Sequence, residues 1–226
     1  KCLEKNAGPY SIIPQFQLFN KQLGIDEPIE LDIEVIKEPD NELYINDIVF
    51  QYYIKSNNKP LPGKGIGEKI PNNLITEFST LSKIPEWRRK LDNEYESPFE
   101  LDGEKWKTVE HYYQASKFKN TNKEFYLLFA LGSKSKISSS VDIAQAAASK
   151  NGKYKKDQLR PKDINIDNEF FNGMNMKVLE KALYAKFSQD NDMKSVLLNT
   201  KKAKLMLYKP RSEPEQSDIL MLVRNQ

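Results

Sequence analysis

Residues 106–118, with the sequence WKTVEHYYQASKF, bring a carboxylate and an amine together in a stretch that is rich in aromatic rings. Glu110 and Lys117 are the groups of interest, since a carboxylate can hold or transfer a proton and a neutral amine can attack an electron-poor carbon. The only histidine of the chain, His111, lies in the same stretch. On a helix it would point about 100° away from Glu110, so a surface or half-buried histidine is the simpler interpretation.

A helix that begins after Thr108, a suitable N-cap, would group the polar side chains on one edge. One sector of about 100° would hold Glu110, Tyr113, Gln114 and Lys117. The neighbouring face is expected to pack inward and would hold Val109, Tyr112 and Ser116. The polar edge is then either a solvated helix face, whose i,i+4 pairs contribute a few tenths of a kcal/mol each, or one wall of a site.

A second stretch that could bind a ligand is the glycine loop PGKGIGE at residues 62–68. Its spacing matches neither a P-loop nor a dinucleotide-binding fingerprint. Glycines allow backbone N–H groups to approach an anion closely, and Lys64 adds a positive charge. An anion-binding loop and a plain flexible turn are both compatible with this pattern.

Composition excludes several classes of function. The chain has 226 residues and a net charge of +3, from 35 Lys and Arg against 32 Asp and Glu, which is too even to indicate nucleic-acid binding. With Cys2 as the single cysteine and one histidine, neither a disulfide framework nor a metal site built on these ligands is expected, and no cofactor is implied. No apolar run is long enough to span a membrane, and no signal-peptide pattern opens the chain. An intracellular location, cytoplasmic or nuclear, is expected.

The chain divides into an N-terminal extension, residues 1–48, and a main domain, residues 49–226. The extension alternates apolar residues at Ile29, Leu31, Ile33 and Val35, which predicts a strand. The main domain is predicted to be α+β and predominantly helical. Its expected strands are 48–55 and 202–208, with a turn at 102–103; its expected helices include 122–132, 139–152, 174–189, 190–200 and 217–226.

The motif WKTVEHYYQASKF resembles the W-x-[ST]-x-E-H-Y-[FY]-Q-[AG]-x-K-[FY] signature of the NADAR family, the NAD- and ADP-ribose-associated proteins. Further similar stretches follow in the expected order: KSNNKPLPGKGIGE, WRRKLDNEYESPFELDG, KNGKYKKDQLRPKDI, LYAKFSQD and LLNTKKAKL. The resemblance covers residues 49–226. The PGKGIGE loop is similar to that of family members from eukaryotes and large viruses.

The resemblance implies an α+β fold and an N-glycosidase that acts on a ribose-linked nitrogen. One implied substrate is ADP-ribose attached to guanine, which is removed to restore DNA or RNA. The alternatives are a phosphorylated intermediate of riboflavin biosynthesis, or a non-catalytic module that binds ADP-ribose. In this interpretation the glycine loop and the polar helix are two walls of one pocket.

Glu110 and Lys117 are the implied catalytic residues. Glu110 would stabilise the positive charge that develops on the sugar or activate water. Lys117 would attack the anomeric carbon and form a Schiff base, or act as a fixed cation. Attack requires a neutral amine, which Glu110 opposes and burial favours, so the sequence leaves the role of Lys117 open.

The substrate-binding residues implied by the resemblance contact phosphates, ribose hydroxyls or the base. They are Lys55, Ser56, Lys64, Gly65, Gly67, Glu68, Trp87, Arg88, Asn93, Tyr95, Tyr113, Gln114 and Arg160. Lys64, Arg88 and Arg160 are expected at the phosphates, and Gln114 at the ribose hydroxyls. The basic run 153–156 is either a nucleic-acid contact or a solvated loop. Trp106 is either part of a stacking surface or part of the core.

Two departures from the family pattern bear on the substrate. The family pattern L-S-N-F-Y-x-S-P-F has an aromatic residue where this chain has Glu94. Tyr95 or Trp87 would then have to supply the ring that stacks on a base, and the departure is the reason to consider a non-catalytic module. The glycine-rich W-G-x-G ending of the bacterial forms is absent.

Overall fold

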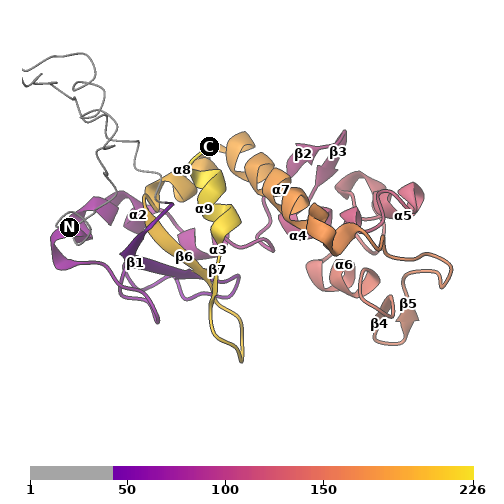
Figure 1. The fold of residues 1–226 in the computed structure, drawn as a ribbon, viewed down its shortest axis with the longest axis horizontal. Coiled ribbons are helices and arrows are strands. Elements are labelled where there is room, and N and C mark those ends of the chain that lie inside the picture. The colour runs from indigo at the N-terminus through magenta and orange to yellow at the C-terminus, as the bar shows by residue number, and fades with distance from the viewer. Residues whose placement is uncertain (1–42) are drawn as a thin grey trace, which may run out of the picture. The chain divides into compact units, whose positions relative to one another are not determined.

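The computed structural model of the chain describes residues 43–226. The strand predicted around residues 29–35 lies outside the described residues. Within the described part, helices alternate with three small sheets (Figure 1), and the predicted α+β class is confirmed. Strand β1 (Ile45–Tyr52) begins before the predicted start of the main domain at residue 49.

The main sheet joins the two ends of the described chain. Its strand order is β1-β6-β7, with β6 (Ala203–Leu207) parallel to β1 and β7 (Glu215–Gln216) antiparallel to β6. Alternate residues of β1 are buried, among them Phe50, which pairs in register with Leu205. The buried strand predicted for residues 48–55 is confirmed, and its side chains alternate between the two faces of the sheet.

Most of the remaining chain is helical. Before the central helix come η1 (Asn72–Phe78), α2 (Ser79–Lys83), α3 (Trp87–Lys90), and the hairpin of β2 (Phe99–Leu101) and β3 (Glu104–Trp106). The central helix is α4 (Val109–Ser116). It is followed by α5 (Lys123–Leu127), η2 (Leu131–Ser133), α6 (Val141–Ala147), β4 (Lys153–Tyr154), β5 (Asp157–Gln158), η3 (Phe170–Met174), α7 (Asn175–Gln189), α8 (Asn191–Asn199) and α9 (Asp218–Arg224).

Helix α7 connects two groups of elements. It packs against α8 and α9, of which α9 contacts β6, and also against α4 and β2 (Figure 1). Helix α4 in turn packs on α6. The polar edge of α4 is therefore enclosed by neighbouring elements, and it is not the outer face of a peripheral helix.

The predicted elements are confirmed for the long helices and for the turn at residues 102–103. Two helices are shorter than predicted: the one expected over 122–132 ends at Leu127, and the one expected over 139–152 ends at Ala147. The helix that ends at Ala147 does not extend to Gly152, because the φ of Gly152 is +61°. Gly152 directly precedes the β4–β5 hairpin, which the sequence did not predict. There the backbone needs a residue that tolerates the left-handed region.

Both tryptophans belong to the core. Trp106 is fully buried and its Nε1 donates to the carbonyl of Leu101 at 2.9 Å, so it is not part of a stacking surface. Trp87 is 3% exposed and packs edge-on against Phe50 at 5.2 Å. The expectation that Trp87 stacks on a base is wrong, because its ring is already used to join α3 to the main sheet.

The glycine loop folds around one carboxylate. Glu68 accepts hydrogen bonds from the backbone N–H groups of Gly63 and Gly65 at 3.1 and 3.0 Å. It also accepts two bonds of 2.7 Å from the Nε and Nη2 of Arg88. Arg88 donates further to the carbonyls of Pro60 and Leu61. The loop is thus a closed frame that is tied to α3.

Removing one partner from this buried pair is expected to destabilise the protein strongly. The side chains of Arg88 and Glu68 are 3% and 1% exposed, so Arg88→Met would leave a buried carboxylate without its cation. The expected loss is about 3–5 kcal/mol in the free energy of unfolding, measured by urea denaturation.

Lys69→Met is the matched control, because Lys69 pairs with Asp47 at the surface, with side chains 56% and 76% exposed. It is expected to cost less than about 1 kcal/mol. Equal losses in the two variants would contradict the view that the Arg88–Glu68 pair holds the loop.

Candidate active site

The start of α4 is held by two contacts. The hydroxyl oxygen of Thr108 accepts from the backbone N–H of His111 at 3.2 Å, which confirms Thr108 as the predicted N-cap. The carbonyl of Asn93 accepts from the N–H of Glu110 at 3.1 Å. The second contact docks the segment 92–95 against the first turn of α4, since it satisfies a backbone donor that the helix leaves open.

The polar edge of α4 is a hydrogen-bonded network. The Nε2 of Gln114 donates to Oε1 of Glu110 at 2.7 Å, and the Nε2 of Gln145, from α6, donates to the same oxygen at 2.9 Å. Gln145 also donates to Glu94 at 3.2 Å. Glu110 is half-buried, and Gln114 is 8% exposed. The interpretation of this edge as an ordinary solvated face is therefore wrong.

Lys117 lies at the end of the same edge. Its Nζ makes no hydrogen bond or ion pair with any other residue in 43–226, and it lies 5.8 Å from the ring centroid of Tyr113 and 5.7 Å from that of Phe171. Burial lowers the pKa of the Lys117 amine below its ordinary value; Glu110 acts in the opposite direction, and Arg160 adds to the lowering. Desolvation is the larger effect, which favours the neutral amine.

Two further carboxyl groups lie beside Glu110. Burial raises the pKa of Glu94, and the charges of Asp92 and Glu110 raise it further, while the bond from Gln145 opposes the rise. Burial is also the main cause that raises the pKa of Asp92, which is 4% exposed. The segment 92–95 thus adds acidic groups that resist ionisation.

A buried lysine holds the segment 92–95 in place. Lys186, on the inner face of α7, is fully buried and donates to the carbonyls of Lys90 and Asp92, both at 2.7 Å. Burial lowers its pKa to about 7, an effect that the charges of Asp92 and Asp190 partly offset. Neither Lys186 nor Gln145 belongs to the residues that the sequence predicted for the site.

His111 is not available for acid–base chemistry at this edge. It is fully buried rather than half-buried, and its Nδ1 lies 2.9 Å from the hydroxyl of Thr108. Burial lowers its pKa to about 4, with Lys107 adding to the effect. The ring is neutral at physiological pH and stabilises the N-terminal turn of α4.

The glycine loop borders a cavity of about 380 Å³ that includes none of the α4 residues. Among the residues that line it are Tyr53, Lys55, Ser56, Lys64, Gly65 and Tyr208. Asn93 and Tyr113 line another cavity, of about 440 Å³, with residues of α7 and α9. These two cavities share no lining residue, and Arg88 ties the glycine loop to α3. That loop and helix form two walls of one pocket stays a prediction.

Two arginines expected at phosphates have other partners. All three nitrogens of Arg88 bond within the loop frame described above. Arg160 is 8% exposed, and its guanidinium donates to the carbonyls of Ala147, Ser149 and Lys150. It closes the C-terminal end of α6, where helix carbonyls lack partners. Phosphate binding by either would have to break these bonds.

Of the remaining predicted residues, Tyr95 lies against the core and Gly67 lies in the exposed part of the loop. Tyr95 is half-buried, packs on the core, and its hydroxyl lies 3.4 Å from Glu86. Gly67 has a φ of +74°, and an added Cβ there would lie 2.5 Å from Nε2 of Gln51. Gly67 and Glu68 thus shape the loop from within.

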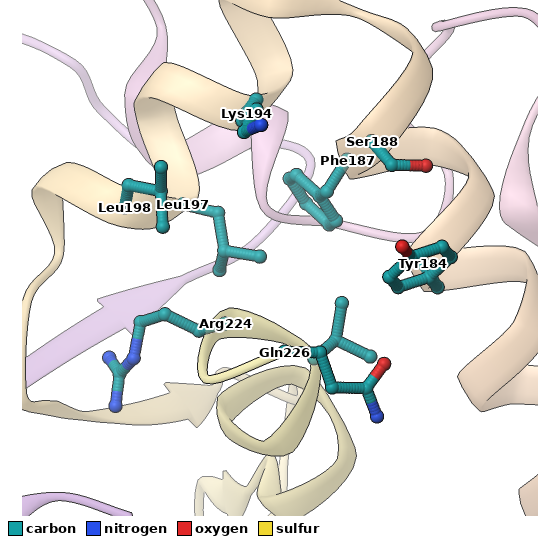
Figure 2. A pocket seen from close by; sticks show the side chains of 9 residues that line it. Tyr184, Phe187, Ser188, Lys194, Leu197, Leu198, Arg224 and Gln226 are labelled. Carbon is teal, nitrogen blue, oxygen red and sulfur yellow. The ribbon is translucent and has the colours of Figure 1, made fainter.

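A third cavity, of about 220 Å³, lies among α7, α8 and α9 and contains none of the predicted site residues (Figure 2). Tyr184 and Phe187 reach it from α7, Leu197 from α8 and Arg224 from α9.

The described residues show no grouping of three or more metal-ligating side chains. Between residues 43 and 226, no helix is both long and apolar enough to cross a membrane.

A domain model described as the NADAR domain matches residues 75–213, and the chain therefore belongs to the NADAR family. This family is associated with N-glycosidase activity. Among solved structures, the chain is similar to the NMR structure of the E. coli protein YbiA, with 19% identity, a TM-score of 0.43, and coverage of 82% of this chain and 86% of that one. No curated protein gave a significant match.

The buried position of His111 predicts an unusual titration. As the only histidine, it should give a single pair of ring C–H resonances in NMR, which titrate together with a midpoint near pH 4 instead of 6.5. Between pH 6.5 and about 4, His111 is protonated in the unfolded chain but not in the folded one. The free energy of unfolding therefore falls as the pH drops from 6.5 to about 4. The urea-unfolded chain is the control. A midpoint near 6.5 in the folded protein would contradict the burial of the ring.

Proposed function

We propose that the protein hydrolyses the C1″–N bond that links ADP-ribose to guanine, in a nucleoside or in nucleic acid, and so reverses ADP-ribosylation. The observation that supports this most directly is the state of Lys117. Its amine lacks an ion pair within residues 43–226, its pKa is lowered by burial, and it shares a helix edge with Glu110. These are the properties that a lysine nucleophile needs.

The proposed chemistry begins with charge on the sugar. As the C1″–N bond lengthens, positive charge develops on the ribose, and the proposed role of the Glu110 carboxylate is to stabilise that charge. Two amide donors, from Gln114 and Gln145, hold this carboxylate. Lys117 then attacks C1″, or the ring-opened aldehyde, and forms a Schiff base that water hydrolyses.

The glycine-loop cavity is the proposed site for the diphosphate and adenosine part of the ligand. Lys55 and Lys64 supply positive charge, and Ser56 a hydroxyl. Tyr53 and Tyr208 lie edge to face, 5.6 Å apart, and offer aromatic surface for a base. In this proposal one long ligand contacts both the polar edge of α4 and the loop cavity, which share no lining residue.

The decisive assay uses purified protein and ADP-ribosylated guanosine, with release of ADP-ribose followed by chromatography. Release supports the proposal, and the same assay with ADP-ribosylated DNA and RNA identifies the natural carrier. Turnover of phosphorylated pyrimidine intermediates alone would instead select the riboflavin-related alternative. Tight binding of ADP-ribose without turnover of either substrate would select a non-catalytic module.

The two proposed catalytic residues are expected to be essential. Glu110→Gln removes the charge while keeping the shape, and should lower kcat by about 10²- to 10⁴-fold. Lys117→Ala removes the nucleophile and should be at least as severe. Glu124→Gln and Lys123→Ala, exposed positions on α5, are the matched controls and should retain wild-type rates. Wild-type turnover in Glu110→Gln or Lys117→Ala would refute the mechanism.

Reduction during turnover separates the two roles considered for Lys117. If the amine forms a Schiff base, borohydride should trap the sugar on this residue, and peptide mass spectrometry should locate the adduct. Lys117→Ala should give no adduct. A fully active enzyme that is never trapped would indicate that Lys117 acts only as a cation.

A further inference from the structure

Two acidic residues, Asp92 and Glu94, occupy positions that are not acidic in the family pattern. The stretch LDNEYESPF aligns with L-S-N-F-Y-x-S-P-F, so Asp92 replaces a serine and Glu94 replaces an aromatic residue. The structure places both beside Glu110, because the carbonyl of Asn93, between them, is bonded to the first turn of α4. A stacking ring has been exchanged for a carboxyl group at the proposed site.

Glu94 and Glu110 form a close pair. Nε2 of Gln145 donates to Oε1 of Glu94 at 3.2 Å and to Oε1 of Glu110 at 2.9 Å. Since one nitrogen contacts both oxygens, these can be no more than about 6 Å apart. Glycoside hydrolysis commonly uses two carboxyl groups that lie on either side of the scissile bond.

The two carboxyl groups have unequal surroundings. Glu110 accepts a second amide bond, from Gln114 at 2.7 Å. Glu94 has only the longer bond from Gln145, and it faces the charges of both Asp92 and Glu110. Its pKa is accordingly raised, with burial as the main cause. Neighbouring acids in such unequal environments commonly divide the roles of proton donor and anion.

An unpartnered group indicates that a ligand belongs here. Gln114 is 8% exposed, and its Oε1 has no hydrogen-bond partner within the described chain, although the Nε2 of the same amide is bound to Glu110. A buried acceptor without a partner costs free energy unless a ligand or water supplies a donor. A ribose hydroxyl beside the carboxyl pair would supply one.

We propose that Glu94 is the general acid of this site: it protonates the departing nitrogen of the base, while Glu110 remains the carboxylate that faces the sugar. This inference rests on the proposed function. Asp92 is less suited, because its carboxyl already accepts the backbone N–H of Glu94 at 2.8 Å and is 4% exposed.

The proton balance is simple. When C1″–N breaks, the nitrogen keeps the bonding pair and takes the proton of the Glu94 carboxyl group, so the base leaves neutral and Glu94 becomes a carboxylate. Lys117 bonds to C1″ in the same stage. Water then adds to the carbon and displaces Lys117, and the proton it loses returns to Glu94. The net change is the addition of one water across the C1″–N bond.

Glu94→Gln tests the proposal, with ADP-ribosylated guanosine as substrate. The amide keeps the shape and the contact region of Gln145 but cannot donate an acidic proton, so kcat should fall by about 10²- to 10⁴-fold. The wild-type rate should decline as the pH rises through the pKa of Glu94, and this alkaline limb should be missing from the residual activity of Glu94→Gln. Glu94→Asp should restore part of the rate together with the limb.

The matched control is Glu96→Gln, since Glu96 lies two residues further on with its side chain 63% exposed. It should retain the wild-type rate and pH profile. Thermal melting of each variant checks folding.

Wild-type activity in Glu94→Gln, or a lowered rate with an unchanged alkaline limb, would overturn the role of Glu94 while leaving the proposed function intact. An inactive wild-type protein that is correctly folded would overturn both.

Discussion

The hydrogen bond between the Asn93 carbonyl and the N–H of Glu110 is the contact on which the candidate site depends. It fixes a segment without regular secondary structure against the first turn of α4, and Lys186 secures that segment from behind through the carbonyls of Lys90 and Asp92. A buried lysine without a paired carboxylate in hydrogen-bond contact is costly, so these two carbonyls and the nearby charge of Asp92 must offset its desolvation. The site is thus assembled from α4, α6 and α7 through one irregular segment.

The same enclosure sets the chemistry of the side chains. Burial makes ionisation harder for Glu94 and protonation harder for Lys117, while the amides of Gln114 and Gln145 donate to Glu110. Within the described residues, no ion pair joins the Lys117 amine to either carboxyl group.

Sequence patterns were sufficient where the period of apolar residues or a cap decided the structure. Thr108, the Asp102–Gly103 turn and the inward face of α4 followed from such local rules. The partners of Arg88 and Arg160 could not be predicted from such rules. In the sequence, an arginine that binds carbonyls of its own fold cannot be told from an arginine that is free to bind a phosphate. Nothing in the alanine-rich sequence around Gln145 indicates that its side chain contacts a carboxylate. The position of Lys186 between Ala185 and Phe187, both of which are buried in α7, is a weak indication that its amine is buried too.

The closed frame of the glycine loop has a consequence for how such proteins diversify. Glu68 and Arg88 keep the loop in shape from inside, so the exposed tip, including Ile66 at 93% exposure, contributes little to folding. In the proposed function, substitutions at this tip would change which distal part of the ligand is bound, while Glu94, Glu110 and Lys117 keep their contacts. Binding specificity and bond cleavage would then evolve at separate parts of the molecule.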